Sequence, residues 1–504
     1  MSAGASVKRA AGAKRAVIPI VPDADDAAGQ MVSMYQSQQK IHARSVSGWF
    51  AAWRWLLVWG TQLLFYGLPW LEWNARQAVL FDLGARRFYI FGLVLYPQDF
   101  IYLTGLLVIA AYSLFLFTAV AGRLWCGFAC PQTVYTEIFM WVERRFEGDR
   151  SARMRLDAGP WTLDKWLRKG GKQAVWIAIG LWTGFTFVGY FTPIHTLLAE
   201  VLSLVNLGGA AQQGLGPWEA FWVLFYGFAT YGNAGFMREQ VCKYMCPYAR
   251  FQSAMFDKDT MIVSYDPGRG EPRGSRSRSV AHADLASRGQ GDCIDCTLCV
   301  QVCPTGIDIR KGLQYECISC SACIDVCDGV MDKMSYPRGL IRFATQNGLA
   351  RQWGRAEMMR RVFRPRVLIY TAVLLAICVA LGTSLVMRSP YRVDVVRDRG
   401  ALAREVQDGR IENVYRLQVM NASESPQRFR IQVAGLPGAT LVTGAEVLVG
   451  ATEARWVPVA VQIAPEKARE LGAGAHPMRF EISRDSDGPA TPLLSEKSTF
   501  VVPR

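Results

Sequence analysis

Residues 293–304 read CIDCTLCVQVCP, and the same cysteine spacing returns as CISCSACIDVCD at residues 317–328. Two successive Cys-x2-Cys-x2-Cys-x3-Cys runs are typical of bacterial ferredoxins that bind two [4Fe–4S] clusters. The short spacing lets three thiolates of one run bind one face of a cubane cluster. The fourth thiolate comes from the other run, because the chain turns away after each third cysteine. The sequence therefore predicts a ferredoxin-like module at about residues 290–340.

The predicted ligand sets cross between the two runs. The first cluster is expected to use Cys293, Cys296, Cys299 and Cys327. The second cluster is expected to use Cys317, Cys320, Cys323 and Cys303. Zinc sites are the alternative for dense cysteines, but they need only four ligands each at looser spacing, so iron–sulfur clusters are favoured. One departure from the ferredoxin pattern is that Asp328, and not a proline, follows the second run.

Two further cysteine pairs follow long apolar runs, in LWCGFACP at 124–131 and VCKYMCP at 241–247. Residues four apart on a helix have β-carbons about 5–6 Å apart, which is too far for the roughly 3.8 Å of a disulfide. The residue before a proline tends to leave helical geometry. We therefore expect Cys130 and Cys246 at helix ends.

If the segments that carry these pairs pack together, four thiols converge. They are Cys126, Cys130, Cys242 and Cys246. Soft thiolates favour Cu(I), zinc or iron–sulfur clusters over hard cations. The plainer alternative is that such cysteines are small buried hydrophobic residues. Two matched pairs at matched positions favour a functional site, with copper as a candidate metal.

The 504-residue chain is 51% hydrophobic, yet its formal net charge is +14. Its apolar residues form blocks of about 20 residues, the length that crosses a bilayer as a helix. Five spans are predicted, at about 49–71, 100–121, 173–192, 218–237 and 367–387. The segments rich in Lys and Arg are expected to face the cytoplasm. The basic charge then reflects membrane topology, and no nucleic-acid partner is expected.

This topology divides the chain into seven regions. Residues 1–48 are a cytoplasmic tail, 49–121 and 173–237 are transmembrane hairpins, and 122–172 is a cytoplasmic loop with the first thiol pair. Residues 238–366 are cytoplasmic and hold the second pair and the ferredoxin module, with a flexible linker expected at 266–279. After the span at 367–387, residues 388–504 are exported. Their short alternating runs and regular turn residues predict an all-β sandwich.

Some cofactors are not expected. The chain contains four histidines, and only His195 lies near a predicted span, at its outer edge. Haem held by two histidines in the membrane is therefore not expected. No Gly-x-Gly-x-x-Gly or Walker loop is present, so no nucleotide cofactor is expected either. Electrons must then come from a quinol or from a redox partner.

This combination of features closely resembles the family of cbb3-type cytochrome c oxidase accessory proteins that includes FixG, RdxA and CcoG. The stretch 293–343 looks like the signature of that family, Asp328 included, and the resemblance covers nearly the whole chain. It implies a multi-pass protein of the bacterial inner membrane that reduces Cu(II) to Cu(I) for the oxidase. It also implies an immunoglobulin-like C-terminal domain in the periplasm, and oxidase-assembly or copper-transport proteins as partners. A homodimer is left open.

Three functions are consistent with the sequence. The first is a cupric reductase in which electrons pass through the clusters to copper near the four thiols. The second is a quinol-linked electron conduit to another partner, in which the same thiols hold a cofactor or gate quinol oxidation. The third is a non-enzymatic assembly scaffold with structural clusters. The membrane thiol pairs also occur in quinol-oxidising proteins of nitrate and nitrous-oxide respiration, so the second function stays open.

Overall fold

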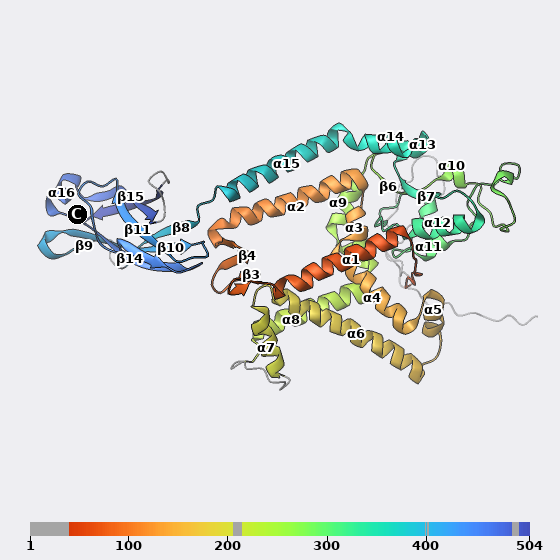
Figure 1. The fold of residues 1–504 in the computed structure, drawn as a ribbon, viewed down its shortest axis with the longest axis horizontal. Helices are drawn as coiled ribbons and strands as arrows, with labels where there is room; N and C mark the ends of the chain where they lie inside the picture. Colours follow the sequence, from red (N-terminus) through yellow and green to blue (C-terminus); the bar gives the residue numbers. More distant parts are fainter. Residues whose placement is uncertain (1–39, 205–213, 399, 401–402, 486–492, 504) are drawn as a thin grey trace, which may run out of the picture.

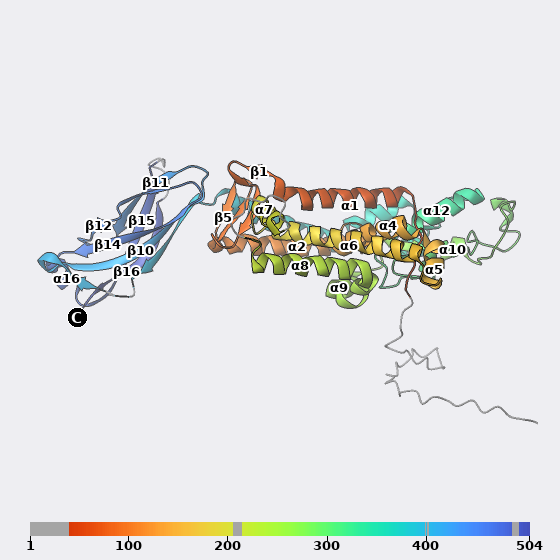
Figure 2. The ribbon, with the colours of Figure 1, turned by 90° about the horizontal axis from the view of Figure 1, so that it is seen from below.

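The computed structural model describes residues 40–204, 214–398, 400, 403–485 and 493–503 (Figure 1). A β domain lies at one end of the long axis, a bundle of helices lies in the middle, and a small mixed module lies at the other end. The helices of the bundle run roughly along this axis in both views (Figure 2). Most of the predicted N-terminal tail, residues 1–39, lies outside the described residues.

A helix is present at each of the five predicted spans. These helices are α1 (Trp49–Gly67), α2 (Phe100–Ala121), α6 (Leu163–Val188), α8 (Pro217–Thr230) with its π-helical continuation Tyr231–Met237, and α15 (Pro365–Val386). Within the described residues, two segments are long and apolar enough to cross a membrane, Pro97–Ala121 and Pro365–Val386. The other three have lower hydropathy or shorter length, because α1 carries Arg54 and several tryptophans, α6 begins with charged residues and α8 has 14 residues.

Two pairs of helices pack closely within the bundle. In the first pair, glycines bring α6 and α8 together: a β-carbon added at Gly184 would clash with the Val223 carbonyl oxygen. Small residues of this kind let helix backbones approach each other in membrane proteins. In the second pair, α2 packs against α15, where the Tyr102 hydroxyl donates to the Ser384 carbonyl oxygen at 3.1 Å (Figure 1).

Each thiol pair lies where one helix ends and the next begins. Cys126 belongs to α3 (Leu124–Phe128), and Cys130 is the N-cap of α4 (Pro131–Glu147). Cys242 belongs to a π-helical segment, Val241–Met245, and Cys246 is the N-cap of α9 (Pro247–Met255). Both N-cap cysteines are extended, with ψ values of 130° and 107°. The prediction that these two cysteines lie at helix ends is confirmed.

The loop between α1 and α2 is folded and contacts the C-terminal domain. It contains β1 (Glu72–Trp73), β2 (Arg76–Gln77), β3 (Val79–Asp82), β4 (Arg87–Ile90) and β5 (Leu93–Leu95). Leu80, Tyr89, Val94 and Tyr96 of this loop form a buried cluster with Met420 of the C-terminal domain. Asp99, which is 2% exposed, pairs with Arg388 and Arg392 in the same contact.

The C-terminal region is a sandwich of two antiparallel sheets, as predicted. One sheet has the order β12 (Thr440–Thr443), β14 (Ala454–Ile463), β10 (Ile411–Asn421), β8 (Tyr391–Arg397), with β9 (Arg404–Glu405) beside β10. The other has the order β13 (Glu446–Val449), β11 (Gln427–Ala434), β15 (Gly474–Arg484), β16 (Leu494–Val502). Fully buried Tyr415, Phe429, Phe480 and Phe500 fill the space between the sheets. The helix α16 (Pro465–Leu471) follows β14.

The cysteine-rich module is closed by two strands from its flanks. β6 (Ile262–Tyr265) pairs antiparallel with β7 (Ile341–Ala344). α11 (Leu298–Gln301) lies within the first cysteine run, and α12 (Ala322–Met334) begins within the second run and continues beyond it. The flexible linker predicted at 266–279 is wrong, because this stretch contacts the module. Arg269 donates to Asp292 and to the Pro337 and Arg338 carbonyl groups, and Arg276 lies over the Tyr336 ring at 5.5 Å.

Candidate redox site

Two small cavities inside the module are each lined by four of the predicted ligand cysteines. The first is lined by Cys293, Cys296, Cys299 and Cys327. The second is lined by Cys303, Cys317, Cys320 and Cys323, with Cys299 also on its wall. Their empty volumes are nearly equal, about 380 and 360 Å³. The structure thus brings together the two crossed sets, each around a space of the same size.

The backbone turns around the two cavities in the same way. Asp295 and Thr297 have left-handed φ values of 53° and 57°, and Ser319 and Ser321 have φ values of 54° and 62°. These residues stand two and four positions after the first cysteine of each run. Left-handed residues in such turns direct backbone N–H groups into a concave space, as in many iron–sulfur and anion sites. The repeated geometry fits an anionic cluster in each cavity.

The donor set also fits a cluster. Burial raises the pKa of the Cys299 and Cys317 thiols to about 11, so both are protonated near pH 7 in the metal-free chain. Metal binding must displace these protons, which couples cluster insertion to the folding of the module. Each thiolate of a cubane binds a different iron, so thiols spread around a cavity suit a cluster.

Asp328, the departure from the ferredoxin pattern, has a structural explanation. It lies in the middle of α12, which continues to Met334, and a proline there would remove a helical hydrogen bond and clash with the preceding turn. Its carboxylate accepts the Gly339 N–H at 2.9 Å. The last two cysteines of the second run therefore lie within α12, and Asp328 links this helix to the turn at Gly339.

The four thiols of Cys126, Cys130, Cys242 and Cys246, here called the membrane-side thiols, lie close enough for their charges to affect one another's pKa. Burial raises the pKa of Cys126 to about 11 and that of Cys242 to about 12, and the charges of the other thiols of this group add to both shifts. The Cys126 thiol also donates to the Gln252 side-chain oxygen at 3.2 Å. In the part of the chain that the structure describes, no group of three or more His, Cys, Asp or Glu side chains converges tightly enough to hold a single metal ion. The four thiols are thus close together without forming a closed mononuclear site.

Helix α3, which carries Cys126, contacts the second cysteine run directly. A β-carbon added at Gly127 would lie 2.7 Å from the Ile318 carbonyl oxygen and 2.8 Å from the backbone N and Cα of Cys320. The backbone of α3 is therefore in contact with the loop that lines the second cavity. The membrane-side thiols and one predicted cluster site form a continuous region.

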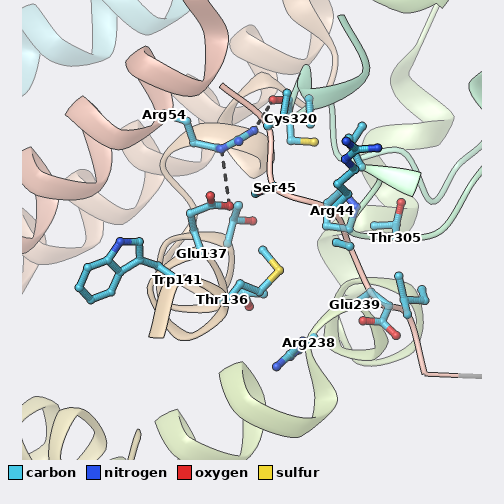
Figure 3. A pocket seen from close by; sticks show the side chains of 18 of the residues that line it. Arg44, Ser45, Arg54, Thr136, Glu137, Trp141, Arg238, Glu239, Thr305 and Cys320 are labelled. Atoms are coloured by element: carbon cyan, nitrogen blue, oxygen red, sulfur yellow. Dashed lines mark hydrogen bonds and ion pairs between the residues drawn. The ribbon is translucent and has the colours of Figure 1, made fainter. Parts of the chain in front are cut away.

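Helix α1 joins the same region through two contacts. The Arg54 guanidinium donates to the Cys320 carbonyl oxygen at 2.8 Å and pairs with Glu137 at 3.6 Å (Figure 3). Asp325, between two predicted ligands on α12, accepts the N–H groups of Phe50 and Ala51 at 3.1 and 2.7 Å. Sequence reasoning missed Arg54, Gly127 and Asp325. Arg54 had a signal, because a lone charge inside a predicted apolar span is usually functional or buried against a partner.

A larger polar cavity lies where α1, α4 and the module meet (Figure 3). Its empty volume is about 1110 Å³, and both Cys242 and Cys320 lie on its wall. One thiol of the membrane-side group and one predicted cluster ligand therefore line the same space.

Comparisons with known proteins agree with this arrangement. Family models match three parts of the chain: a 4Fe–4S dicluster domain at residues 237–346, a 4Fe–4S binding domain at 103–148, and the immunoglobulin-like fold at the C-terminus of FixG at 381–503. These matches define the chain as a dicluster iron–sulfur protein with a C-terminal immunoglobulin-like domain.

Relatives extend over most of the chain. The nitrogen fixation protein FixG of Rhizobium meliloti is 39% identical over 474 residues, which cover 86% of this chain and 88% of FixG. Protein RdxB of Cereibacter sphaeroides is 42% identical over 412 residues, which cover 80% of this chain and 84% of RdxB. A crystal structure of a FixG-related protein from Vibrio parahaemolyticus is 24% identical with a TM-score of 0.20, covering 23% of this chain and 97% of that one. The chain belongs to the FixG/RdxA family.

Proposed function

We propose that this chain is a multi-pass protein of the bacterial inner membrane that reduces Cu(II) to Cu(I) for the assembly of a cbb3-type cytochrome c oxidase. The observation that carries the proposal is the contact at Gly127, where the thiol-bearing helix α3 meets the loop that lines the second cavity. Soft thiols that prefer Cu(I) thus lie directly beside a redox module.

The cluster ligands are assigned from the two cavities. Cys293, Cys296, Cys299 and Cys327 would hold one [4Fe–4S] cluster, and Cys303, Cys317, Cys320 and Cys323 would hold the other. When bound, these clusters supply one-electron storage and transfer. Buried Met331, Leu340 and Ile341 line the first cavity and limit the access of water and oxygen to its buried thiolates, whereas Cys296 is exposed.

Thiols of the membrane-side group, Cys126 and Cys242 among them, would bind the copper. Thiolate ligation stabilises Cu(I) more than Cu(II), so copper bound there is more easily reduced. The raised pKa values of Cys126 and Cys242 keep both thiols protonated near pH 7 before copper binds. Copper binds the thiolate form, so each thiol that binds it releases its proton. The electron donor to the module would be a quinol or a redox protein, and oxidase-assembly or copper-transport proteins would receive the Cu(I).

The test is anaerobic. The purified protein is reduced, the reductant is removed, and Cu(II) is added with a Cu(I)-specific chelator. Cu(I) formation matched by oxidation of the iron–sulfur absorbance is expected. The variants Cys126→Ala and Cys242→Ala should lose Cu(I) formation and keep their iron–sulfur spectrum. If the reduced wild-type protein leaves Cu(II) unchanged, copper reduction is excluded, and quinol becomes the next substrate to test.

A second candidate follows from one observation. The 4Fe–4S binding domain matched at residues 103–148 contains Cys126 and Cys130 and none of the eight predicted ligands of the module. The four membrane-side thiols would then hold a further cluster and act as an electron conduit. Iron analysis separates the two functions, because two [4Fe–4S] clusters give about 8 iron atoms per chain and three give about 12. Cys242→Ala should lower the count only if a third cluster is present.

A further inference from the structure

The polar cavity between α1, α4 and the module has an excess of positive charge. Five arginines line it against three acidic residues. The arginines are Arg44, Arg54, Arg144, Arg153 and Arg238, and the acids are Glu137, Asp149 and Glu239. Buried Glu143 adds a fourth carboxylate behind this wall, where it pairs with Arg153 and Arg238, so the arginines exceed the acids by one. The space therefore favours an anion over a bare divalent cation.

Two of these arginines are available to a ligand. Arg153 and Arg238 both pair with buried Glu143, at 2.7 and 3.0 Å, and Arg54 pairs with Glu137. Among the described residues, Arg44 and Arg144 have no ion-pair partner, although both line the cavity. Two guanidinium groups that line one cavity without carboxylate partners are suited to bind carboxylate oxygens, because each has a planar set of N–H donors.

The other residues that line the cavity indicate that the bound anion contains a soft metal ion. Cys242 of the membrane-side thiol group lies on the wall, as does Cys320 of the second cluster set. Trp55, Met140 and Trp141 add an apolar and thioether surface. An anion bound at Arg44 and Arg144 would share this cavity with a thiol that binds soft metals.

We propose that this cavity binds an anionic Cu(II) chelate, a copper ion held by a carboxylate ligand, and passes its copper to Cys242. The proposal rests on the copper reduction proposed above and adds the substrate class. Arg44 and Arg144 hold the carboxylates of the chelator, which offset the charge that would repel a bare copper ion.

The transfer balances in atoms and electrons. A copper–oxygen bond to the chelator breaks as a copper–sulfur bond to Cys242 forms. One electron from the iron–sulfur module reduces Cu(II) to Cu(I), and the module is oxidised by one electron. The thiol proton of Cys242 leaves with the released chelator.

The first experiment compares two copper complexes of opposite charge, the anionic Cu(II)–citrate and the cationic Cu(II)–ethylenediamine, with the reduced holoprotein. The variants are Arg44→Gln, Arg144→Gln and the double variant. Arg145→Gln is the matched control, since Arg145 follows Arg144 on α4 and does not line the cavity. Each cavity variant should raise the KM for Cu(II)–citrate about tenfold, the effect of one lost charge-assisted hydrogen bond. The KM for Cu(II)–ethylenediamine and the kcat should stay unchanged. Equal effects on both complexes would overturn the proposal and leave copper reduction standing.

The second experiment needs no redox chemistry. Binding of Mg(II)–citrate is measured by calorimetry, since Mg(II) takes oxygen ligands and does not bind thiols. The wild type and Arg145→Gln should bind it, and the double variant should bind at least tenfold more weakly. No binding, or equal binding to all three proteins, would overturn the anion site even if copper is reduced. If neither copper complex is reduced while Mg(II)–citrate binding depends on Arg44 and Arg144, the copper function fails and the anion site stands.

Discussion

Gly127 is the residue at which the thiol-bearing helix and the second cysteine run meet. The atoms that a β-carbon would meet there belong to the backbone of Ile318 and Cys320, so no side-chain rotation relieves the contact. Gly127→Ala should therefore push the second run away from α3, at a cost of about 1–3 kcal/mol typical of overpacking. We expect the variant to lose iron from one cluster, measured as iron and acid-labile sulfide per chain.

A matched glycine provides the control for this prediction. A β-carbon at Gly329, which lies within α12, meets nothing within 4 Å. Gly329→Ala should keep the full iron content and stabilise the module by up to about 1 kcal/mol, because alanine favours the helix. If both alanine variants keep their iron, the Gly127 contact does not position the second cluster loop.

At this same scale, the cysteine sites were predictable and their neighbours were not. The spacing of the cysteines within each run is local, so it predicts which three thiols of a run surround one cavity, and the ferredoxin pattern predicts that the fourth comes from the other run. Arg54 and Asp325 act on partners 266 and 275 residues away in the sequence, Cys320 and Phe50. No local pattern encodes such pairings, because they depend on how the bundle and the module dock.

At the scale of elements, the first turn of α1 is capped by the module. Gly48, its N-cap, has no side chain, and the Asp325 carboxylate of α12 accepts the Phe50 and Ala51 N–H groups instead. Asp325→Asn should cost about 1 kcal/mol, because it removes a charged acceptor from a helix N-terminus. Thermal unfolding of the detergent-solubilised holoprotein measures the loss. Asp332→Asn, in the more exposed last part of the same helix, is the control and should leave the unfolding temperature within error.

Helix α4 is held to α5 (Arg150–Ala158) and α6 by a buried carboxylate. Burial opposes the charged form of Glu143, but Arg238, Arg153 and Lys172 outweigh it and lower the pKa of this carboxyl to about 2. Glu143→Gln leaves three cations without this counter-charge, and we expect a loss of about 3 kcal/mol at pH 7. The lowered pKa means that the carboxylate stabilises the fold above pH 4.5, the ordinary value, and that this contribution is lost as pH falls towards 2.

The comparison across pH checks the sign of this effect. The difference in unfolding free energy between wild type and Glu143→Gln should be constant from pH 7 to 5 and shrink below pH 4.5. Both proteins are unfolded in urea at each pH, and the difference between their unfolding free energies cancels the effects of acid on groups that both proteins share. A gap that stays constant down to pH 3 would mean that the carboxylate charge does not hold these helices.

Among the elements, the long helices could be predicted from the sequence, and the short strands and the π-helical segment could not. Helices were predicted at all five apolar blocks, because a block of that length and composition favours a helix whatever its neighbours. The strands β1–β5 between α1 and α2 were not predicted, since they are two to four residues long and depend on contact with the β domain. The π-helical segment with Cys242 was not predicted either, because such segments arise from tertiary packing and are frequent at functional sites.

At the scale of the whole molecule, the cysteine-rich elements and the cysteine-free β domain lie at opposite ends of the long axis. The elements α3 and α9 at the thiol pairs, and α11 and α12 of the module, lie towards one end (Figure 1), and the β domain, which contains no cysteine, forms the other end. The bundle between them includes both segments that are long and apolar enough to span a membrane. In the proposed topology, a bilayer around this bundle would place the module and the β domain on opposite sides. The basic segments next to the module, including the one at 351–366, favour the cytoplasm for that side.

This arrangement predicts which positions react with a membrane-impermeant maleimide in spheroplasts. Glu470→Cys places a thiol on exposed α16 of the β domain, and Arg288→Cys places one on the exposed surface of the module. The unmodified protein should resist labelling, because its thirteen cysteines then lie inside the cell or within the bundle. Glu470→Cys should react in intact spheroplasts, and Arg288→Cys should react only after permeabilisation. Labelling of Arg288→Cys in intact spheroplasts would place the module outside the cell, where iron–sulfur clusters and reduced thiols would face an oxidising compartment. The cytoplasmic copper-reduction site proposed above would then be excluded together with the topology.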